Sequence, residues 1–128
     1  MKITQSTAEL DKPIGQNSPN LVRRSFLNYL RSSFAYSQNW EHPTGKVFKH
    51  SLIKRVLKDY MEMDHTGYKA LWYLWTTQGT RSFIAEQLNH SSPTIKRRWD
   101  NSINVIMLML LFPELKPETF VLFMGPTD

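Results

Sequence analysis

Residues 80–99 carry the pattern that most limits what this chain can fold into. Thr80 belongs to the residue types that are preferred as helix N-caps, and it precedes a predicted helix over residues 81–88. Asn89 follows that helix, and Asn is among the few non-Gly residues that tolerate a left-handed backbone. The pattern therefore predicts a short helix that ends in a sharp change of chain direction.

A second helix is predicted to begin directly after this turn. Either Ser91 or Ser92 can cap it, and Pro93 suits its first turn, where a missing N–H costs no helical hydrogen bond. Ala85 is small, which lets the two helices cross at short range. The residues that we expect to face the core, spaced four apart within each helix, are Ile84, Leu88, Ile95 and Trp99.

A crossed helix pair with a basic outer side on its second helix is typical of proteins that read the major groove of DNA. Thr94 and Arg97 are expected to read base edges, since Arg is the usual partner of guanine. Lys96 and Arg98 are expected to contact phosphates, and the start of the first helix is expected to add further phosphate contacts. The predicted DNA contacts are Thr80, Arg81, Ser91, Ser92, Thr94, Lys96, Arg97 and Arg98. The plainer interpretation is a helical hairpin with a solvated basic face.

The same segment resembles a known family. Residues 84–99, with the sequence IAEQLNHSSPTIKRRW, resemble the helix-turn-helix of sigma-factor region 4. The family pattern of Ile-Ala-Glu, Leu-Gly, Ser and Thr-Val-Lys is matched without a gap, with Asn89 in place of Gly and His90 in place of an apolar residue. The preceding KALWYLW, residues 69–75, resembles the helix before that motif.

Small phage late-gene regulators of the ArpU/RinA type carry similar modules and are of comparable length. The resemblance covers residues 67–110, roughly a third of the chain, and it implies a helical DNA-binding module. No pattern typical of the −10-reading part of a sigma factor is present, so a complete sigma factor is not expected.

The whole chain is expected to be all-α, with five to six helices and the helix-turn-helix in its C-terminal half. The recognition helix is expected to extend into an apolar helix. We divide the sequence into a flexible N-terminal arm over 1–17, a basic helical region over 18–63, the sigma-like region over 64–115 and a tail with a short apolar helix over 116–128.

Three helices are predicted before the sigma-like motif. The first begins at Ser18-Pro19, and its apolar stripe, at spacings of four, consists of Val22, Phe26, Leu30 and Phe34. A loop over 37–45 separates it from a second helix over 46–63. The buried face of this second helix is expected to consist of Phe48, Leu52, Ile53, Val56, Leu57 and Tyr60. Asp64 or Thr66 caps a third helix over 68–77.

The stretch 101–115 leaves almost no polar face, so a helix there must be covered on all sides. This helix is either buried within the chain or covered by a second copy in a homodimer interface through residues from Val105 to Phe112. This run is far shorter than the roughly 20 apolar residues that span a bilayer, so no membrane partner is expected.

The formal charge of +5 is unevenly distributed along the sequence. Residues 1–100 hold 15 basic against 8 acidic residues, whereas residues 101–128 hold 1 against 3. A basic body suits contact with a polyanion, and the plainer interpretation is that the charge keeps a small protein in solution. The chain has no cysteine and the first 16 residues carry no apolar signal segment, so we expect a cytoplasmic protein.

The sequence carries no recognisable catalytic or metal-binding pattern. None of the four histidines lies three or four residues from another, so neither a metal nor a cofactor is expected. Asp59, Glu62 and Asp64 are expected to form a solvated acidic patch rather than a catalytic group, because no partner base is indicated. We therefore do not expect an enzyme.

These observations predict a sequence-specific regulator of transcription that binds double-stranded DNA, encoded by a phage or mobile element. Two alternatives remain. The sigma-like module could instead bind RNA polymerase or another protein partner. The chain could also be a DNA-packaging accessory similar to a small terminase subunit.

Overall fold

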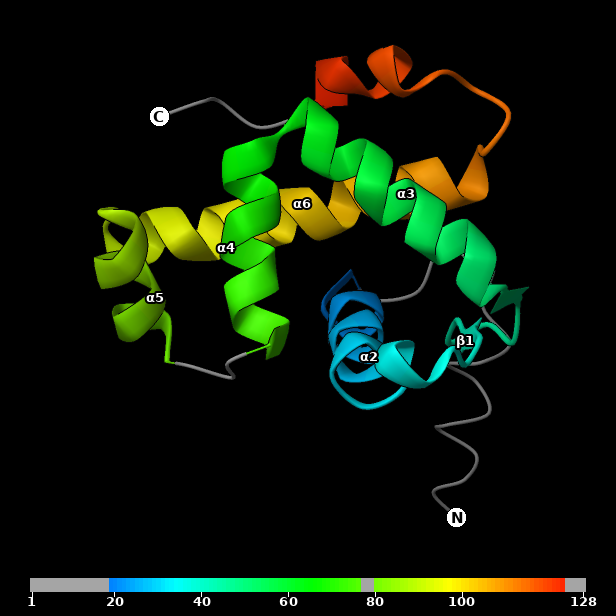
Figure 1. Ribbon diagram of the computed structural model, residues 1–128, viewed down its shortest axis with the longest axis horizontal. Coiled ribbons are helices and arrows are strands. Elements are labelled where there is room, and N and C mark those ends of the chain that lie inside the picture. Colours follow the sequence, from blue (N-terminus) through cyan, green and yellow to red (C-terminus); the bar gives the residue numbers. More distant parts are fainter. Residues whose placement is uncertain (1–18, 77–79, 124–128) are drawn as a thin grey trace. The chain divides into compact units, whose positions relative to one another are not determined.

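A computed structural model of the chain describes residues 19–76 and 80–123, apart from the side chain of Phe123. The predicted all-α character is confirmed, and the elements are shown in Figure 1. In chain order they are α2 (Pro19–Ser32), the 3-10 helix η2 (Phe34–Tyr36), β1 (Trp40–Glu41), β2 (Val47–Phe48), α3 (His50–Met63), α4 (His65–Thr76), α5 (Arg81–Leu88), α6 (Ser92–Leu111) and the 3-10 helix η3 (Pro117–Phe123). The expected arm over 1–17 and the expected cap Ser18 lie outside the described residues.

The chain divides into two compact units, Met1–Ser51 and Leu52–Asp128. The N-terminal unit is organised around aromatic side chains. Phe26, Tyr29 and Leu30 of α2 are buried, as is Trp40 of β1. The ring centroids of Trp40 and Phe26 lie 5.0 Å apart, and the indole N–H of Trp40 donates a hydrogen bond to Ser25 Oγ. The buried side of α2 thus packs onto a single Trp.

A small β-hairpin replaces the first turn of the helix that was predicted over 46–63. Trp40 pairs with Phe48 in an antiparallel register, and their rings stack at 5.6 Å. Gly45, with φ of 96°, allows the reversal of direction between the two strands. The helix begins only at His50, whose backbone N–H donates to Asn39 Oδ1 at 3.0 Å. The local apolar pattern did not reveal this hairpin, because its register depends on stacking across the turn.

The C-terminal unit contains four α-helices among its described residues, and Figure 1 shows α4, α5 and α6 there. Four residues of the predicted buried face of α3 are buried, namely Ile53, Val56, Leu57 and Tyr60. Leu52 is only half-buried, and Phe48 is buried in β2 rather than in the helix. Helix α4 begins three residues earlier than predicted because Asp64 caps it, with Asp64 Oδ1 accepting from Gly67 N at 3.0 Å. Helices α4, α5 and α6 all contact one another.

Helix α6 is continuous from Ser92 to Leu111, so the second helix of the motif does run on into the apolar stretch. Within the stretch 101–115, the side chains already buried in a single chain are Ser102, Ile103, Val105, Ile106, Met109 and Leu110. Phe120 of η3 is also buried, and η3 contacts α6. Among the described residues, no helix is both long and apolar enough to cross a membrane.

Candidate nucleic-acid interface

The turn between α5 and α6 has the local structure that the sequence predicts. Thr80 Oγ1 accepts a hydrogen bond from Phe83 N at 3.1 Å, which satisfies one of the free N–H groups at the start of α5. Asn89 adopts the left-handed conformation with φ of 58°. Of the two candidate caps for α6, Ser91 is the cap, and its Oγ accepts from Thr94 N at 3.2 Å.

The apolar contacts expected between the two helices are largely present. Ile84, Ala85 and Ile95 are buried, and Leu88 is half-buried. Trp99 is also half-buried, and its indole N–H donates to Ala70 O of α4 at 3.1 Å. This hydrogen bond ties the middle of α6 to α4, so the orientation of α6 is set by both neighbouring helices.

Most of the predicted contact residues lie at the surface of this unit. The exposed ones are Thr80, Arg81, Ser91, Lys96 and Arg97, whereas Ser92 and Thr94 are half-buried. Thr94 Oγ1 lies 2.8 Å from Ser91 Oγ, so its hydroxyl is held against the cap. Lys96 Nζ forms an ion pair of 2.7 Å with Asp100 Oδ2, one helical turn later. Part of the positive charge of Lys96 is therefore already balanced within α6.

Arg98 does not lie on that surface, and its predicted role as a phosphate contact is corrected. Only 7% of Arg98 is exposed, and its guanidinium faces the Asp64 carboxylate at 3.7 Å. Among the described residues, Arg98 Nε has no hydrogen-bond partner. An Arg in this position links α6 to the start of α4 and is not available to a phosphate at the surface.

Asp64 belongs to a buried polar network, and its predicted place in a solvated acidic patch is wrong. Tyr60 Oη donates to Asp64 Oδ2 at 2.7 Å and lies 2.9 Å from Ser102 Oγ. Ser102 Oγ in turn donates to Gly67 O at 3.3 Å. Burial raises the pKa of Tyr60 well above its ordinary range, so the phenol stays protonated and can donate to the carboxylate.

Sequence reasoning missed this network for a physical reason. The spacing of four between Tyr60 and Asp64 was visible in the sequence, and it could have suggested a contact across one helical turn. The contribution of Ser102 was not visible, because Ser102 lies 42 residues from Tyr60. The network joins α3, α4 and α6, and it thereby holds the side of α6 that is opposite to Lys96 and Arg97.

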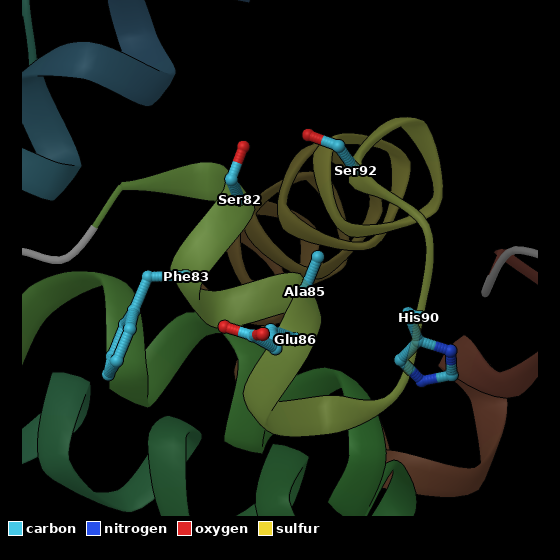
Figure 2. Close-up of a pocket in the computed structure, with 6 residues that line it drawn as sticks. All are labelled: Ser82, Phe83, Ala85, Glu86, His90 and Ser92. Atoms are coloured by element: carbon cyan, nitrogen blue, oxygen red, sulfur yellow. The ribbon is translucent and has the colours of Figure 1, made fainter.

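A shallow hollow of 570 Å³ lies over α5, the turn and the start of α6. Figure 2 shows its lining residues, which are Ser82, Phe83, Ala85, Glu86, His90 and Ser92. The hydroxyls of Ser82 and Ser92 lie on one side of it, and Glu86 places a carboxylate at its edge (Figure 2). The hollow therefore offers hydrogen-bonding groups and one negative charge, which does not suit a bound phosphate.

Comparison with family models finds no match for this chain. Comparisons with curated proteins and with solved structures also find no significant match. No group of three or more potential metal ligands occurs among the residues that the structure describes. The features of this chain that bear on its function are therefore the geometry of the α5–α6 pair and the distribution of charge.

Proposed function

We propose that this protein binds double-stranded DNA in a sequence-specific manner and regulates transcription. The observation that carries the proposal is that the start of α6 has one buried side and one exposed basic side. Ile95 and Arg98 are buried, whereas Lys96 and Arg97 are exposed and project outward beside the turn. A rigid helix with cations on its outer side, joined by a tight turn to a bracing helix, has the properties that a major-groove reader requires.

In the proposed complex, the start of α6 enters the major groove. Arg97 reads a base edge by donating two hydrogen bonds, which suits O6 and N7 of guanine. Lys96 contacts a phosphate after exchanging its pairing with Asp100, and the exposed Thr80 and Arg81 at the start of α5 contact the backbone. Arg98 takes no part in DNA contact and acts by positioning α6.

The first experiment measures binding of the full chain to random-sequence duplex DNA by fluorescence anisotropy at two salt concentrations. We expect binding that weakens steeply as salt rises, because counterions are released from the DNA. Selection of bound sequences from a random pool then identifies a preferred site. Binding that is absent, or that does not respond to salt, would contradict the proposal.

Arg97→Ala tests the base-reading role at the level of one side chain. We expect this variant to lose about 1–3 kcal/mol on the selected site and to relax its preference there. Lys96→Ala is the matched control, since it removes a neighbouring exposed cation and is expected to weaken selected and scrambled DNA equally. An equal loss on both DNAs for Arg97→Ala would contradict the base-reading role.

A second candidate function has one observation in its favour. Phe83 of α5 is 44% exposed and Trp72 of α4 is 41% exposed. Exposed aromatic side chains are enriched where proteins bind one another, so the unit could contact RNA polymerase or another protein. Retention of purified polymerase by the full chain, lost in Phe83→Ser but not in Arg97→Ala, would favour this function over DNA reading.

A further inference from the structure

The positive charge of this protein is concentrated in the unit that does not contain the α5–α6 pair. Residues 52–128 carry nine basic and eight acidic residues, a net charge of +1. The described part of the N-terminal unit, residues 19–51, carries five basic residues and one acidic residue, a net charge of +4. A protein that neutralises several phosphates needs a matching number of cations, and the C-terminal unit supplies few of them.

Within the C-terminal unit, two of the predicted phosphate contacts are already paired with acids. Arg98 is buried against Asp64, and Lys96 is bound to Asp100. Glu86 adds a further carboxylate beside the turn. The α5–α6 pair is therefore better suited to reading bases than to supplying the sequence-independent part of the affinity.

Helix α2 carries three of the five cations of the described N-terminal unit, and two of them, Arg24 and Arg31, lie on one exposed stripe of the helix. Asn20, Arg24, Asn28 and Arg31, spaced by four, four and three residues, are all exposed and form one stripe along the helix. Phe26, Tyr29 and Leu30 are buried. Because Phe26 and Tyr29 pack against Trp40, the helix is held with its polar stripe outward.

The chemistry of the stripe suits a nucleic-acid backbone. Guanidinium and amide groups both donate hydrogen bonds to phosphate oxygens. Arg24 and Arg31 are seven residues apart, which places them about 10 Å apart along the helix axis. Phosphates on one DNA strand recur about every 3.4 Å along the axis, so the two side chains can reach different phosphates.

We propose that the outer stripe of α2 is a second DNA-binding surface, which contacts the phosphate backbone of double-stranded DNA without reading its sequence. This inference rests on the proposed function and extends it by assigning affinity and specificity to different units of the chain. The N-terminal unit supplies the salt-dependent affinity, and the start of α6 supplies the specificity.

The test compares Arg24→Gln/Arg31→Gln with the unchanged full chain on a selected duplex and on a scrambled one. Gln preserves helix propensity and hydrogen bonding while it removes charge. We expect affinity for both duplexes to fall by the same factor, about tenfold, so that their ratio stays unchanged. The slope of log K against log salt should decrease by about 2 in magnitude, since each lost phosphate contact lowers it by roughly 1.

Lys54→Gln/Lys58→Gln is the matched control, because it removes two exposed cations from α3 in the C-terminal unit. We expect this variant to change the slope by less than half as much. Circular dichroism checks that both variants keep their helices. If the double variant of α2 loses helix content, the single Arg24→Gln variant replaces it, with an expected slope change of about 1.

The possible results separate this inference from the proposed function. A slope that is unchanged in the α2 variant, or an equal effect of the α3 control, would overturn the inference while DNA binding itself stands. A changed ratio between the two duplexes would overturn the claim that α2 does not read sequence. If the unchanged chain binds no DNA, the proposed function fails, and this inference fails with it.

Discussion

Among single residues, Arg98 of α6 and Asp64 at the start of α4 form a withdrawn ion pair, with Arg98 Nη1 3.7 Å from Asp64 Oδ1. Both side chains are largely withdrawn from solvent, with 8% and 12% of their surfaces exposed. Burying two charges together contributes little net stability, but removing one of them leaves the other without compensation. The pair therefore makes the position of α6 sensitive to a single substitution.

Asp64→Asn tests this pair. Asn is also a good N-cap, so the variant can keep the hydrogen bond to Gly67 N while it removes the charge opposite Arg98 and the acceptor of Tyr60 Oη. We expect the free energy of unfolding to fall by about 3 kcal/mol in urea denaturation. Asp100→Asn is the control, since its ion pair with Lys96 is solvent-exposed and should contribute less than about 1 kcal/mol. Equal losses in the two variants would show that the buried Asp64–Arg98 pair contributes no more to stability than an exposed ion pair.

Gly67 is required by the close approach of neighbouring side chains. A Cβ at this position would overlap with Asp64 Oδ2 and lie 2.8 Å from Tyr60 Oη. Ala is favoured over Gly inside helices by about 1 kcal/mol, yet we expect Gly67→Ala to be destabilising by about 1–3 kcal/mol because of this overlap. Thermal unfolding measures the change, with Thr66→Ala at an exposed position of the same turn as control. A stabilised Gly67→Ala variant would contradict the packing of this network.

At the scale of elements, the β-hairpin depends on a histidine that is kept neutral. His42 is buried, and its Nδ1 accepts a hydrogen bond from Thr44 N at 3.1 Å. That hydrogen bond requires the lone pair of Nδ1, so the neutral ring is the form that fits the hairpin. Burial lowers the pKa of His42 below its ordinary value of 6.5.

A pH dependence follows from this lowered pKa. The unfolded chain binds the proton of His42 more readily than the folded chain, so its contribution to stability is present above about pH 6.5 and is lost as pH falls toward the lower folded pKa. NMR titration of the imidazole should give a midpoint below 6.5. His42→Gln should reduce the loss of hairpin signals between pH 7 and pH 5. A midpoint at or above 6.5 would contradict the buried, neutral ring.

For the whole molecule, the structure shows which apolar side chains in the second half of α6 are buried within one chain. Val105, Ile106, Met109 and Leu110 are buried without a second subunit, whereas Phe112 remains 44% exposed. Within the run from Val105 to Phe112, Met107, Leu108 and Leu111 are half-buried. A homodimer interface through this run stays a prediction.

Ile106→Ala distinguishes burial of α6 within one chain from burial of α6 by a second subunit. We expect its free energy of unfolding to fall by about 2–5 kcal/mol, because the side chain is fully buried within one chain. The denaturation midpoints of the variant and of the unchanged chain should not depend on protein concentration. Phe112→Ala is the control, since an exposed side chain should contribute little to folding. A concentration-dependent midpoint would show that a second subunit covers this helix.

The sequence predicted the all-α class and the helix-capping residues, whereas it predicted the surroundings of Arg98 and Asp64 wrongly. The bounds of α5, the left-handed Asn89 and the cap Thr80 follow from interactions among residues at most four positions apart. The predicted DNA contacts at the surface of α5 and α6 remain predictions, with Arg98 removed from the set. Arg98 lies three residues after Ile95, so helix geometry places both on one side of α6, and the expectation of a surface position for Arg98 followed from its charge alone.

The ends of the helices around the turn can be read from the amino-acid sequence, because caps, turn residues and apolar spacing act through neighbouring peptide groups. Three features depend on three-dimensional packing instead: Arg98 faces inward, Asp64 caps α4 while it pairs with α6, and Trp40 and Phe48 form a hairpin. These features join residues that are distant in the sequence. Their energies depend on desolvation and on the fit of several side chains at once, which no local pattern encodes.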